Sequence, residues 1–370
     1  MLHTHSRSVA DKGKEDVMKK LEVEIKKKLK NFDLDMSFYT EKGCLGILGA
    51  SGCGKSMTLK AIAGIITPES GKISTENKVF FDSANKINMP PQKRRVGYLF
   101  QNYALFPNMT VADNIAAGVV GGADKKKLSK EEINKKVYEL MEKFHISELK
   151  NQYPFKLSGG QQQRTALARI IASDPEILLL DEPFSAMDTY LREELQIELK
   201  NRLNQFDGCS IIVSHDRDEI YKLCDRTMII DQGRTVVVED TKKLFECPKH
   251  KEAARLTGCK NISKIEKIAS NKVHSLDWGI DLEVDSEVPD NVKYIGIRAH
   301  DFVPVNKDSN KENLIEISIC DITETPFERT FLFKCKRNPK ENMWMKLNRD
   351  DIQIPEAVYV DKKNILLLTE

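Results

Sequence analysis

Residues 49–56 read Gly49-Ala50-Ser51-Gly52-Cys53-Gly54-Lys55-Ser56, which matches the pattern G-x-x-x-x-G-K-S of a phosphate-binding loop. The apolar run Cys44–Leu48 before this loop predicts a buried parallel strand, and apolar residues at helical spacing after it predict a helix. Backbone N–H groups of such a loop, together with the helix N-terminus, surround an anion. We therefore expect the whole loop to bind a nucleotide, with Lys55 on the β- and γ-phosphates and the Ser56 hydroxyl on Mg²⁺.

The composition is that of a globular chain. It has 370 residues, of which 40% are apolar and 31% charged, and its net charge is +2. This length suits roughly two or three domains, and the small net charge gives no indication of a nucleic-acid partner. The eight cysteines form no C-x-x-C pair, which argues against a zinc site and favours a reduced cytosolic protein. Because no apolar run approaches about 18 residues and no signal-peptide core is present, we expect no membrane span.

The pattern of predicted elements divides the chain. Residues 1–18 are polar and aperiodic, and we expect either a disordered tail or a true start at Met18 instead of Met1. Over residues 19–255, apolar strands alternate with amphipathic helices, beginning with a hairpin and including a capped helix over 129–145. This alternation predicts an α/β fold around a mostly parallel sheet.

The residues after 260 have a different pattern. Apolar and polar residues alternate over 276–284, 315–319 and 331–335, and Pro, Asn and Asp separate these runs. We therefore predict that residues 260–370 form a small all-β, barrel-like domain. Because the motifs for nucleotide hydrolysis all precede residue 220, we expect this domain to have a regulatory function, and the alternative is an appendage that stabilises a dimer.

A second motif supplies the acids that a phosphate-binding loop needs. The apolar run Ile177–Leu180 predicts a buried strand, and Asp181 at its end is placed to hold Mg²⁺. Glu182 follows, and in an extended chain its side chain points away from that of Asp181. A carboxylate there can polarise the attacking water, which makes Glu182 the candidate catalytic base. The alternative is that both acids only cap the next helix.

Together with further motifs, these residues resemble the ATPase subunit of ABC transporters. Leu157–Gln161 reads LSGGQ, the signature of that family, and the match runs in family order from about residue 19 to 255. Gln101 corresponds to the Q-loop, residues 185–188 to the D-loop and His215 to the switch histidine. The resemblance implies a P-loop NTPase fold, the ABC ATPase cassette, with ATP and Mg²⁺ as cofactors.

The resemblance also implies roles for the motifs. LSGGQ alone is a second glycine-rich turn at a helix N-terminus and hence a second anion site. In the family, this signature closes over the nucleotide on the P-loop of the other subunit in a head-to-tail homodimer, so Ser158, Gly160 and Gln161 would contact ATP across the interface. Gln101 would sense Mg²⁺ and touch the membrane subunit, and His215 would contact the γ-phosphate.

Two positions depart from the family pattern. The family usually has an aromatic residue just before the hairpin turn that stacks on adenine, and the nearest positions here are Leu29 and Phe32. Met57 stands after the P-loop serine, where Thr is common, and we expect little consequence.

Other stretches narrow the resemblance to importers. Pro90–Gln101 looks like importer ATPases, and the C-terminal domain resembles the oligomer-binding (OB, TOBE-like) regulatory domain of molybdate, sulfate, sugar and polyamine importers. Residues 256–261 and 296–301 look most like molybdate importers. Arg298 and His300 in the second stretch are candidate oxyanion donors because cationic donors suit an oxyanion, and the alternative is that they are surface residues at a strand end. The resemblance implies permease subunits, an indirect substrate-binding protein and a peripheral position on the cytoplasmic face of the membrane. Sulfate, polyamine, ferric iron and sugar stay open as substrates.

Two interpretations from other classes stay open. A soluble ABC protein acting on DNA or ribosomes usually carries a long coiled-coil insertion or two cassettes, and neither pattern occurs in this sequence. The other interpretation is a regulatory module without ATPase activity. The sequence argues against it, because it retains Lys55, Asp181, Glu182 and His215.

Overall fold

The computed structural model describes residues 21–30, 32–122, 128–184, 189–305, 311–338, 340–349 and 354–370. The predicted tail at 1–18 and the D-loop match at 185–188 lie outside these residues. Across the described ranges, no helix is long and apolar enough to cross a membrane. We call residues 21–256 the large-sheet region and residues 261–370 the β region.

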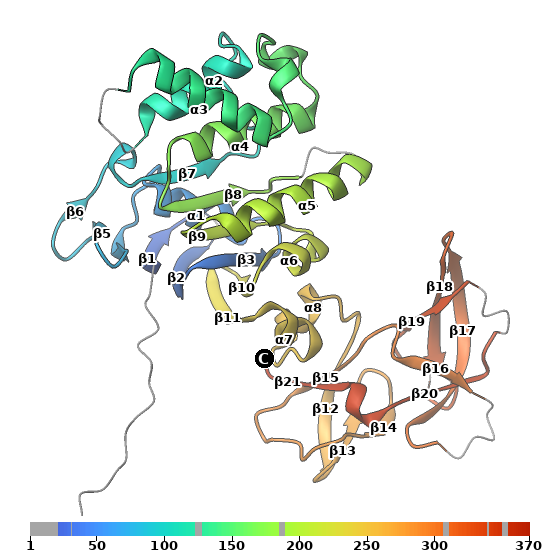
Figure 1. Cartoon of the computed structure of the whole chain (residues 1–370). Helices are drawn as coiled ribbons and strands as arrows, with labels where there is room; N and C mark the ends of the chain where they lie inside the picture. The colour runs from blue at the N-terminus through green and yellow to red at the C-terminus, as the bar shows by residue number, and fades with distance from the viewer. Residues whose placement is uncertain are drawn as a thin grey trace, which may run out of the picture.

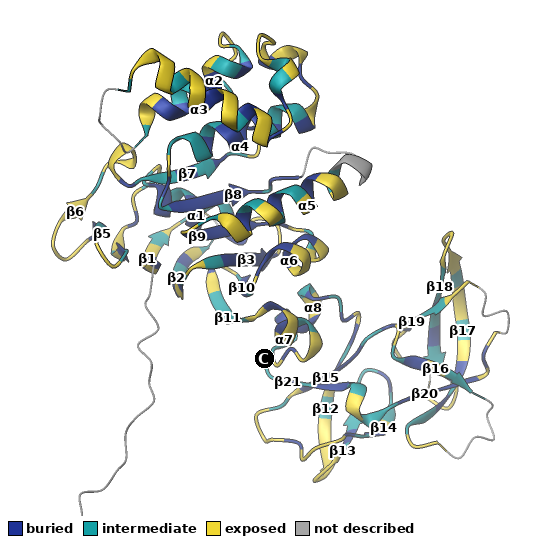
Figure 2. Cartoon of the chain, viewed as in Figure 1, coloured by how far each residue is buried: buried dark blue, intermediate teal, exposed yellow. Residues whose placement is uncertain are grey.

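One sheet of 11 strands organises the large-sheet region. Its strands are β1 (Leu21–Lys28), β2 (Asp33–Thr40), β3 (Gly43–Gly49), β4 (Ser70–Ser74), β5 (Val79–Asp82), β6 (Ile87–Asn88), β7 (Val96–Leu99), β8 (Ile177–Asp181), β9 (Cys209–Val213), β10 (Arg226–Asp231) and β11 (Arg234–Asp240). The neighbours β10, β3, β9, β8 and β7 run parallel, while β1 and β2 form the predicted antiparallel hairpin. β3, β8 and β9 are buried almost throughout, as Figure 2 shows, because both faces of these strands are covered.

Helices cover both faces of this sheet. They are α1 (Lys55–Ala63), α2 (Val111–Gly121), α3 (Lys130–Lys143), α4 (Gly159–Ala172), α5 (Thr189–Gln205), α6 (Arg217–Leu223), α7 (Thr241–Glu246) and α8 (Lys251–Leu256). Short 3₁₀ turns lie at Pro91–Lys93, Ser147–Leu149 and Pro154–Lys156 in the same region, and at Lys362–Asn364 in the β region. The predicted capping box of α3 is confirmed, since Ser129 and Glu132 exchange both capping bonds. Figure 1 shows α2, α3 and α4 gathered together beyond the β7 edge of the sheet.

Alternation along β3 separates two apolar cores. Cys44 and Leu48 pack into one cluster with α2, α4 and α6, whereas Leu45 and Ile47 pack into another with α1 and the hairpin. Side chains of a strand point alternately to the two faces of the sheet, so the strand that leads into the P-loop is held from both sides. The predicted α/β fold with a mostly parallel sheet is confirmed.

The β region consists of two antiparallel five-stranded sheets. Its strands are β12 (Asn261–Ala269), β13 (Lys272–Ser275), β14 (Ile280–Glu283), β15 (Tyr294–Ile297), β16 (Phe302–Val305), β17 (Leu314–Glu324), β18 (Glu328–Cys335), β19 (Met343–Asn348), β20 (Ala357–Val360) and β21 (Ile365–Leu368). Residues from both sheets, including Val273, Leu282 and Phe333, share one apolar core. The all-β prediction is therefore confirmed, with the strands hydrogen-bonded as two sheets.

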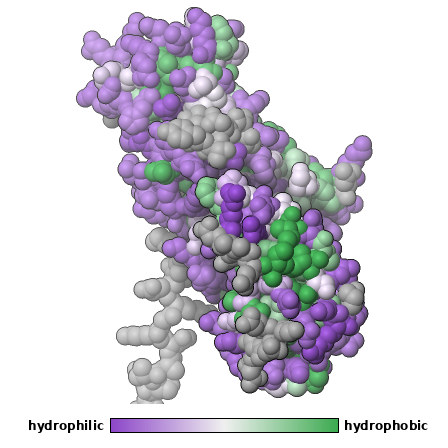
Figure 3. Space-filling view, turned by 90° about the vertical axis from the view of Figure 1, so that its right-hand side faces the viewer, coloured by the Kyte–Doolittle hydropathy of each residue, from purple (hydrophilic) through white to green (hydrophobic). Residues whose placement is uncertain are grey.

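One strand predicted in the β region differs from the structure. The alternation over 276–284 predicts a continuous strand, but a turn over 276–279 joins β13 to β14, and Gly279 there has a φ of 68°. Trp278 is only 2% exposed in this turn, so its burial comes from the shared core and not from a strand. Figure 3 shows that the surface on this side is mainly hydrophilic, and that the most extensive apolar patch lies in the lower half of the view, where Figure 1 places the β region.

Several contacts join the two regions. The amide of Lys251 in α8 donates to Thr369 O (3.0 Å), and the amide of Thr369 donates to Lys249 O (2.8 Å). Arg298 Nη1 donates to Thr257 O (3.1 Å), and Nη2 donates to Phe245 O. Two donors of Arg298 are therefore engaged by backbone carbonyls, which weakens its case as an oxyanion donor.

Candidate functional site

The P-loop connects β3 to α1 as predicted, and two of its glycines require positive φ. Gly52 has a φ of 79°, and Gly54 at the N-cap of α1 has a φ of 107°. Side chains are disfavoured in this backbone conformation, so glycine lets the loop turn back over the helix N-terminus. At Gly49, a Cβ would lie 2.6 Å from Ile230 O, which shows how closely β10 approaches the loop.

Lys55 lies inside the loop that it is predicted to serve. Its side chain is 6% exposed, and its ammonium donates to Gly49 O (2.8 Å) and Ala50 O (2.9 Å). These carbonyls satisfy a charge that would otherwise be buried without a partner. A phosphate that enters the loop would therefore replace the carbonyl oxygens of Gly49 and Ala50 as the acceptor of the Lys55 ammonium.

The two predicted Mg²⁺ ligands lie together although they are far apart in sequence. Ser56 Oγ donates to Asp181 Oδ1 at 2.9 Å, and Asp181 is only 7% exposed. A hydroxyl and a carboxylate are the oxygen ligands that Mg²⁺ takes beside nucleotide phosphates. Among the described residues, no group of three or more His, Cys, Asp or Glu could hold a metal without such phosphates. The donor set thus fits a nucleotide-bound Mg²⁺.

Sequence reasoning missed Tyr98 in β7. Its hydroxyl donates to Asp181 Oδ2 at 2.9 Å, and burial beside that carboxylate raises the pKa of the phenol, so Tyr98 stays a protonated donor. The parallel pairing of β7 with β8 creates this contact. A tyrosine in a strand carries no motif, so only the order of strands in the sheet could have indicated it.

Three predicted residues meet at the carboxylate of Glu182. His215 Nδ1 lies 3.4 Å from Glu182 Oε2, and Gln101 Nε2 donates to the same oxygen at 3.5 Å. The extended backbone assumed for Glu182 is wrong: β8 ends at Asp181, and Glu182 has a φ of 48° while its amide donates to Val213 O (2.9 Å). The chain bends there because this amide bonds to the end of β9, and the bend separates the two neighbouring acids.

A pocket connects these groups with the hairpin. Its lining includes Ser51, Lys55 and Ser56 from the loop, together with Glu182, Leu29, Phe32 and Met57. The two residues considered for adenine stacking, Leu29 and Phe32, therefore line the same pocket. Met57, which differs from the family pattern, lines it as well.

The signature residues lie at the N-terminus of α4. Ser158 Oγ accepts from the Gln161 amide (3.3 Å), Gln161 Oε1 accepts from the Ser158 amide (2.9 Å), and Gly160 is buried. Within the part of the chain that the structure describes, none of these residues lines the P-loop pocket. One copy of the chain thus brings the P-loop, Asp181, Glu182, Gln101 and His215 together, but not the signature.

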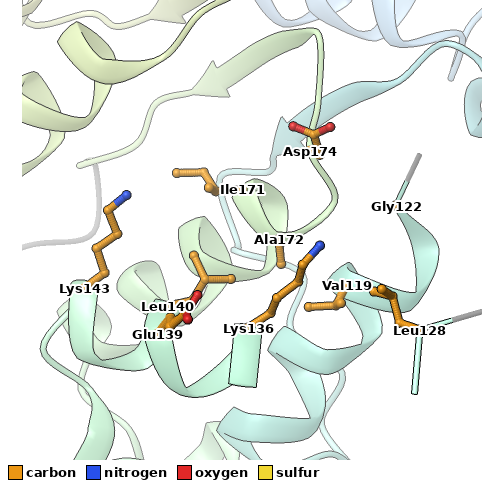
Figure 4. Close-up of a pocket in the computed structure, with 10 residues that line it drawn as sticks. All are labelled: Val119, Gly122, Leu128, Lys136, Glu139, Leu140, Lys143, Ile171, Ala172 and Asp174. Carbon is orange, nitrogen blue, oxygen red and sulfur yellow. The ribbon is translucent and has the colours of Figure 1, made fainter. Parts of the chain in front are cut away.

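A different pocket lies among α2, α3 and the end of α4 (Figure 4). Its lining combines Lys136 and Lys143 with Glu139 and Asp174 on an apolar floor. It includes none of the predicted site residues, so we assign it no part in nucleotide chemistry.

Comparisons with known proteins agree with the geometry. Residues 31–185 match the family model of the ABC transporter. The molybdate/tungstate import ATP-binding protein WtpC of Thermococcus kodakarensis is 40% identical over 281 residues, which cover 75% of this chain and 81% of that protein. The Fe(3+) ions import ATP-binding protein FbpC of Haemophilus influenzae is 41% identical over 225 residues, 60% of this chain and 62% of that protein. The chain thus spans less than two thirds of the latter relative.

Two further similarities concern substrate and assembly. The spermidine/putrescine import ATP-binding protein PotA of Thermotoga maritima is 42% identical over 241 residues, 65% of this chain and 62% of that protein. An ATP-binding cassette solved as a dimer in a post-hydrolysis state with ADP and Pi superposes with a TM-score of 0.52 at 25% identity. That superposition covers 60% of this chain and 98% of the cassette.

Proposed function

This chain belongs to the family of ABC transporter ATP-binding proteins, and from this membership we propose that it binds and hydrolyses ATP to energise an importer. The observation that carries the proposal is the convergence of Gln101, Glu182 and His215 beside the paired Ser56 and Asp181. Mg²⁺, when bound by Ser56 and Asp181, would neutralise charge on the phosphates.

Different residues of this chain bind the phosphates, activate the attacking water and orient the catalytic carboxylate. Lys55 and the loop amides hold the phosphates, and Glu182 accepts the proton of the attacking water. His215 and Gln101 both contact Oε2 of Glu182 and hold this carboxylate, and His215 is free to turn toward the γ-phosphate because its side chain is 63% exposed. Ser158, Gly160 and Gln161 of a second copy complete the site in a head-to-tail homodimer.

Glu182→Gln tests this assignment. It keeps the shape but removes the carboxylate, so ATP binding should persist while turnover falls by about 100-fold or more. Light scattering should then show a doubled mass with ATP, since the closed dimer no longer hydrolyses its nucleotide. Glu69→Gln, an exposed acid in the turn before β4, is the control. Near-normal hydrolysis by Glu182→Gln would contradict the proposed role.

An exposed apolar surface near Gln101 supports a permease partner. Phe106 is 46%, Met109 39% and Phe155 75% exposed, and the ring of Phe155 stacks on Tyr153 with centroids 5.9 Å apart. The two segments are adjacent, because the Val111 amide donates to Gln152 O (2.9 Å). We propose that permease subunits dock here and hold the chain at the cytoplasmic face of the membrane. Phe155→Ser should reduce copurification with the permease without changing ATP affinity.

For the substrate, we propose an oxyanion, with molybdate first. The support is the resemblance of residues 256–261 and 296–301 and the 81% coverage of the molybdate/tungstate relative. Iron, polyamines and sulfate are named by other relatives and remain the alternatives, together with sugar. The test is the melting temperature of the cognate substrate-binding protein with molybdate, sulfate, Fe³⁺ or spermidine. An increase with spermidine alone would contradict the proposal that the substrate is an oxyanion.

We also propose that the β region regulates turnover. It can do so only if a ligand binds it differently in the open and closed dimer. The ATPase activity of the assembled transporter, with and without millimolar molybdate, tests this for the full chain and for a chain ending at Lys260. A response of both, or of neither, would contradict oxyanion regulation through this region.

A further inference from the structure

A second pocket lies at the junction of the two regions, apart from the P-loop. Its walls come from α8 and the segment after it, from β12 and β15 of one sheet, and from β19 of the other sheet. The large-sheet region and both sheets of the β region therefore contribute to one site. None of the residues assigned to hydrolysis lines it among the described residues.

The charge of this pocket is strongly unbalanced. Lys251, Arg255, Lys260 and Lys264 line it beside a single carboxylate, Asp277. Arg255 is paired with Glu252, with 2.7 Å between Nη2 and Oε2. Across the described ranges, the ammonium groups of Lys251, Lys260 and Lys264 have no carboxylate within 4.0 Å. Four cations against two carboxylates leave two positive charges, which suits a group with about two negative charges, such as a phosphate monoester.

Aromatic rings hold two of these ammonium groups in place. Lys251 Nζ lies 4.5 Å from the ring centroid of Tyr294, and Lys260 Nζ lies 4.7 Å from that of Trp344. Tyr294 is buried, but Trp344 is 37% exposed and offers a flat apolar surface beside Ile262. A flat ring can stack on such a surface while its charged group contacts the lysines.

A buried asparagine fixes the wall that carries Trp344. Asn261 is 2% exposed; its Nδ2 donates to Trp344 O (2.9 Å), and its Oδ1 accepts from the Trp344 amide (2.6 Å). Since Asn261 follows Lys260 directly, the same clamp positions that lysine against the indole ring. Burial raises the pKa of the Cys259 thiol to about 11, so this wall residue stays neutral at pH 7 and does not offset the positive charge.

We propose that this pocket binds a small phosphorylated ligand with a flat ring. The phosphate contacts Lys251, Lys260 and Lys264, and the ring lies against Trp344. A bound ligand then bridges α8 and the two sheets of the β region. The proposal does not depend on ATP hydrolysis or on the transported substrate, because the pocket shares no residue with the P-loop site.

The two tryptophans of the chain allow a site-specific test. Trp278 is buried in the core of the β region, whereas Trp344 lines the pocket. In ¹⁹F NMR of the full chain with 5-fluorotryptophan, assigned with Trp344→Phe, AMP and phenyl phosphate should shift the Trp344 resonance saturably and leave Trp278 in place. Adenosine, which lacks the phosphate, and inorganic phosphate, which lacks the ring, should each bind at least about tenfold more weakly.

A matched pair of variants separates this pocket from general charge effects. Lys260→Gln should weaken AMP binding about tenfold, while Lys242→Gln, the same charge change at an exposed position of α7, should leave it unchanged. An unmoved Trp278 resonance shows that each variant is folded. The proposal is overturned if neither phosphate ester shifts Trp344, if Lys260→Gln binds as wild type does, or if inorganic phosphate binds as tightly as AMP.

Discussion

The P-loop site and the junction pocket both present positive charge, but they are built in opposite ways. In the P-loop, the donors are backbone amides and one buried ammonium, and Gly49 O and Ala50 O already satisfy that ammonium. In the junction pocket, the cations are side chains from α8, the segment after it and β12, and aromatic rings hold two of them, Lys251 and Lys260. The ammonium of the first site is therefore buried and already paired, whereas the second site depends on how two regions pack. Exposed charges are screened by salt much more than buried ones.

The largest effect is expected for Ser158→Arg, which tests whether one chain contains the whole P-loop site. Ser158→Arg should abolish ATP hydrolysis while a monomer still binds ATP, because the signature does not line the pocket of its own chain. Mixing Ser158→Arg with Lys55→Ala should restore part of the activity, since mixed dimers retain one intact composite site. Ser158→Thr, which keeps the capping oxygen of α4, is the control. Loss of nucleotide binding by the Ser158→Arg monomer would break this half of the comparison.

A smaller but selective effect is expected for Lys55→Ala. The affinity for a fluorescent ATP analogue should fall about 100-fold, because the phosphates lose a charge-assisted contact. The ¹⁹F response of Trp344 to AMP should not change. Lys60→Ala, one turn later in α1 and outside the pocket, serves as the control. A parallel loss at both sites would show that they are not independent.

Asn261→Ala is the corresponding change beside the junction pocket, where the P-loop site should be unaffected. It leaves the amide and carbonyl of Trp344 and the carbonyl of Ile297 without their side-chain partner, which should cost about 2–3 kcal/mol in unfolding of the β region. Urea titration followed by tryptophan fluorescence measures this, because both tryptophans of the chain lie in the β region, and Asn271→Ala in the β12–β13 turn is the control. ATP affinity should be unchanged. An unchanged midpoint for Asn261→Ala would contradict the clamp.

The smallest effect is expected at Tyr98. Tyr98→Phe removes the bond to Asp181 Oδ2, worth about 1 kcal/mol, so the MgCl₂ concentration for half-maximal ATPase activity should rise severalfold. Tyr138→Phe, at an exposed position of α3, should not change this concentration. An unaltered Mg²⁺ dependence in Tyr98→Phe would mean that this bond does not orient the carboxylate.

Much of the fold follows from local patterns. The P-loop, the capping box of α3 and the alternation along β1 and β2 each depend on neighbouring residues, and the structure has them as predicted. The turn at 276–279 could not be predicted, because alternation alone does not tell a strand from two short strands with a buried tryptophan between them. The bend at Glu182 was missed for a related reason, since its amide bonds to β9 and not to a sequence neighbour.

The sequence by itself determined the glycine loop before a helix, which forms an anion site from contiguous backbone, and it thereby predicts which groups bind phosphate. It also indicated that a second copy is needed, through a second glycine-rich turn in one chain. Only the tertiary structure decided what surrounds these groups. Strand order brings Tyr98 to Asp181, and the approach of β9 to β8 brings His215 to Glu182. The packing of α8 against two sheets places Lys251 and Trp344 on one pocket, and such contacts between distant residues leave no periodic signal in sequence.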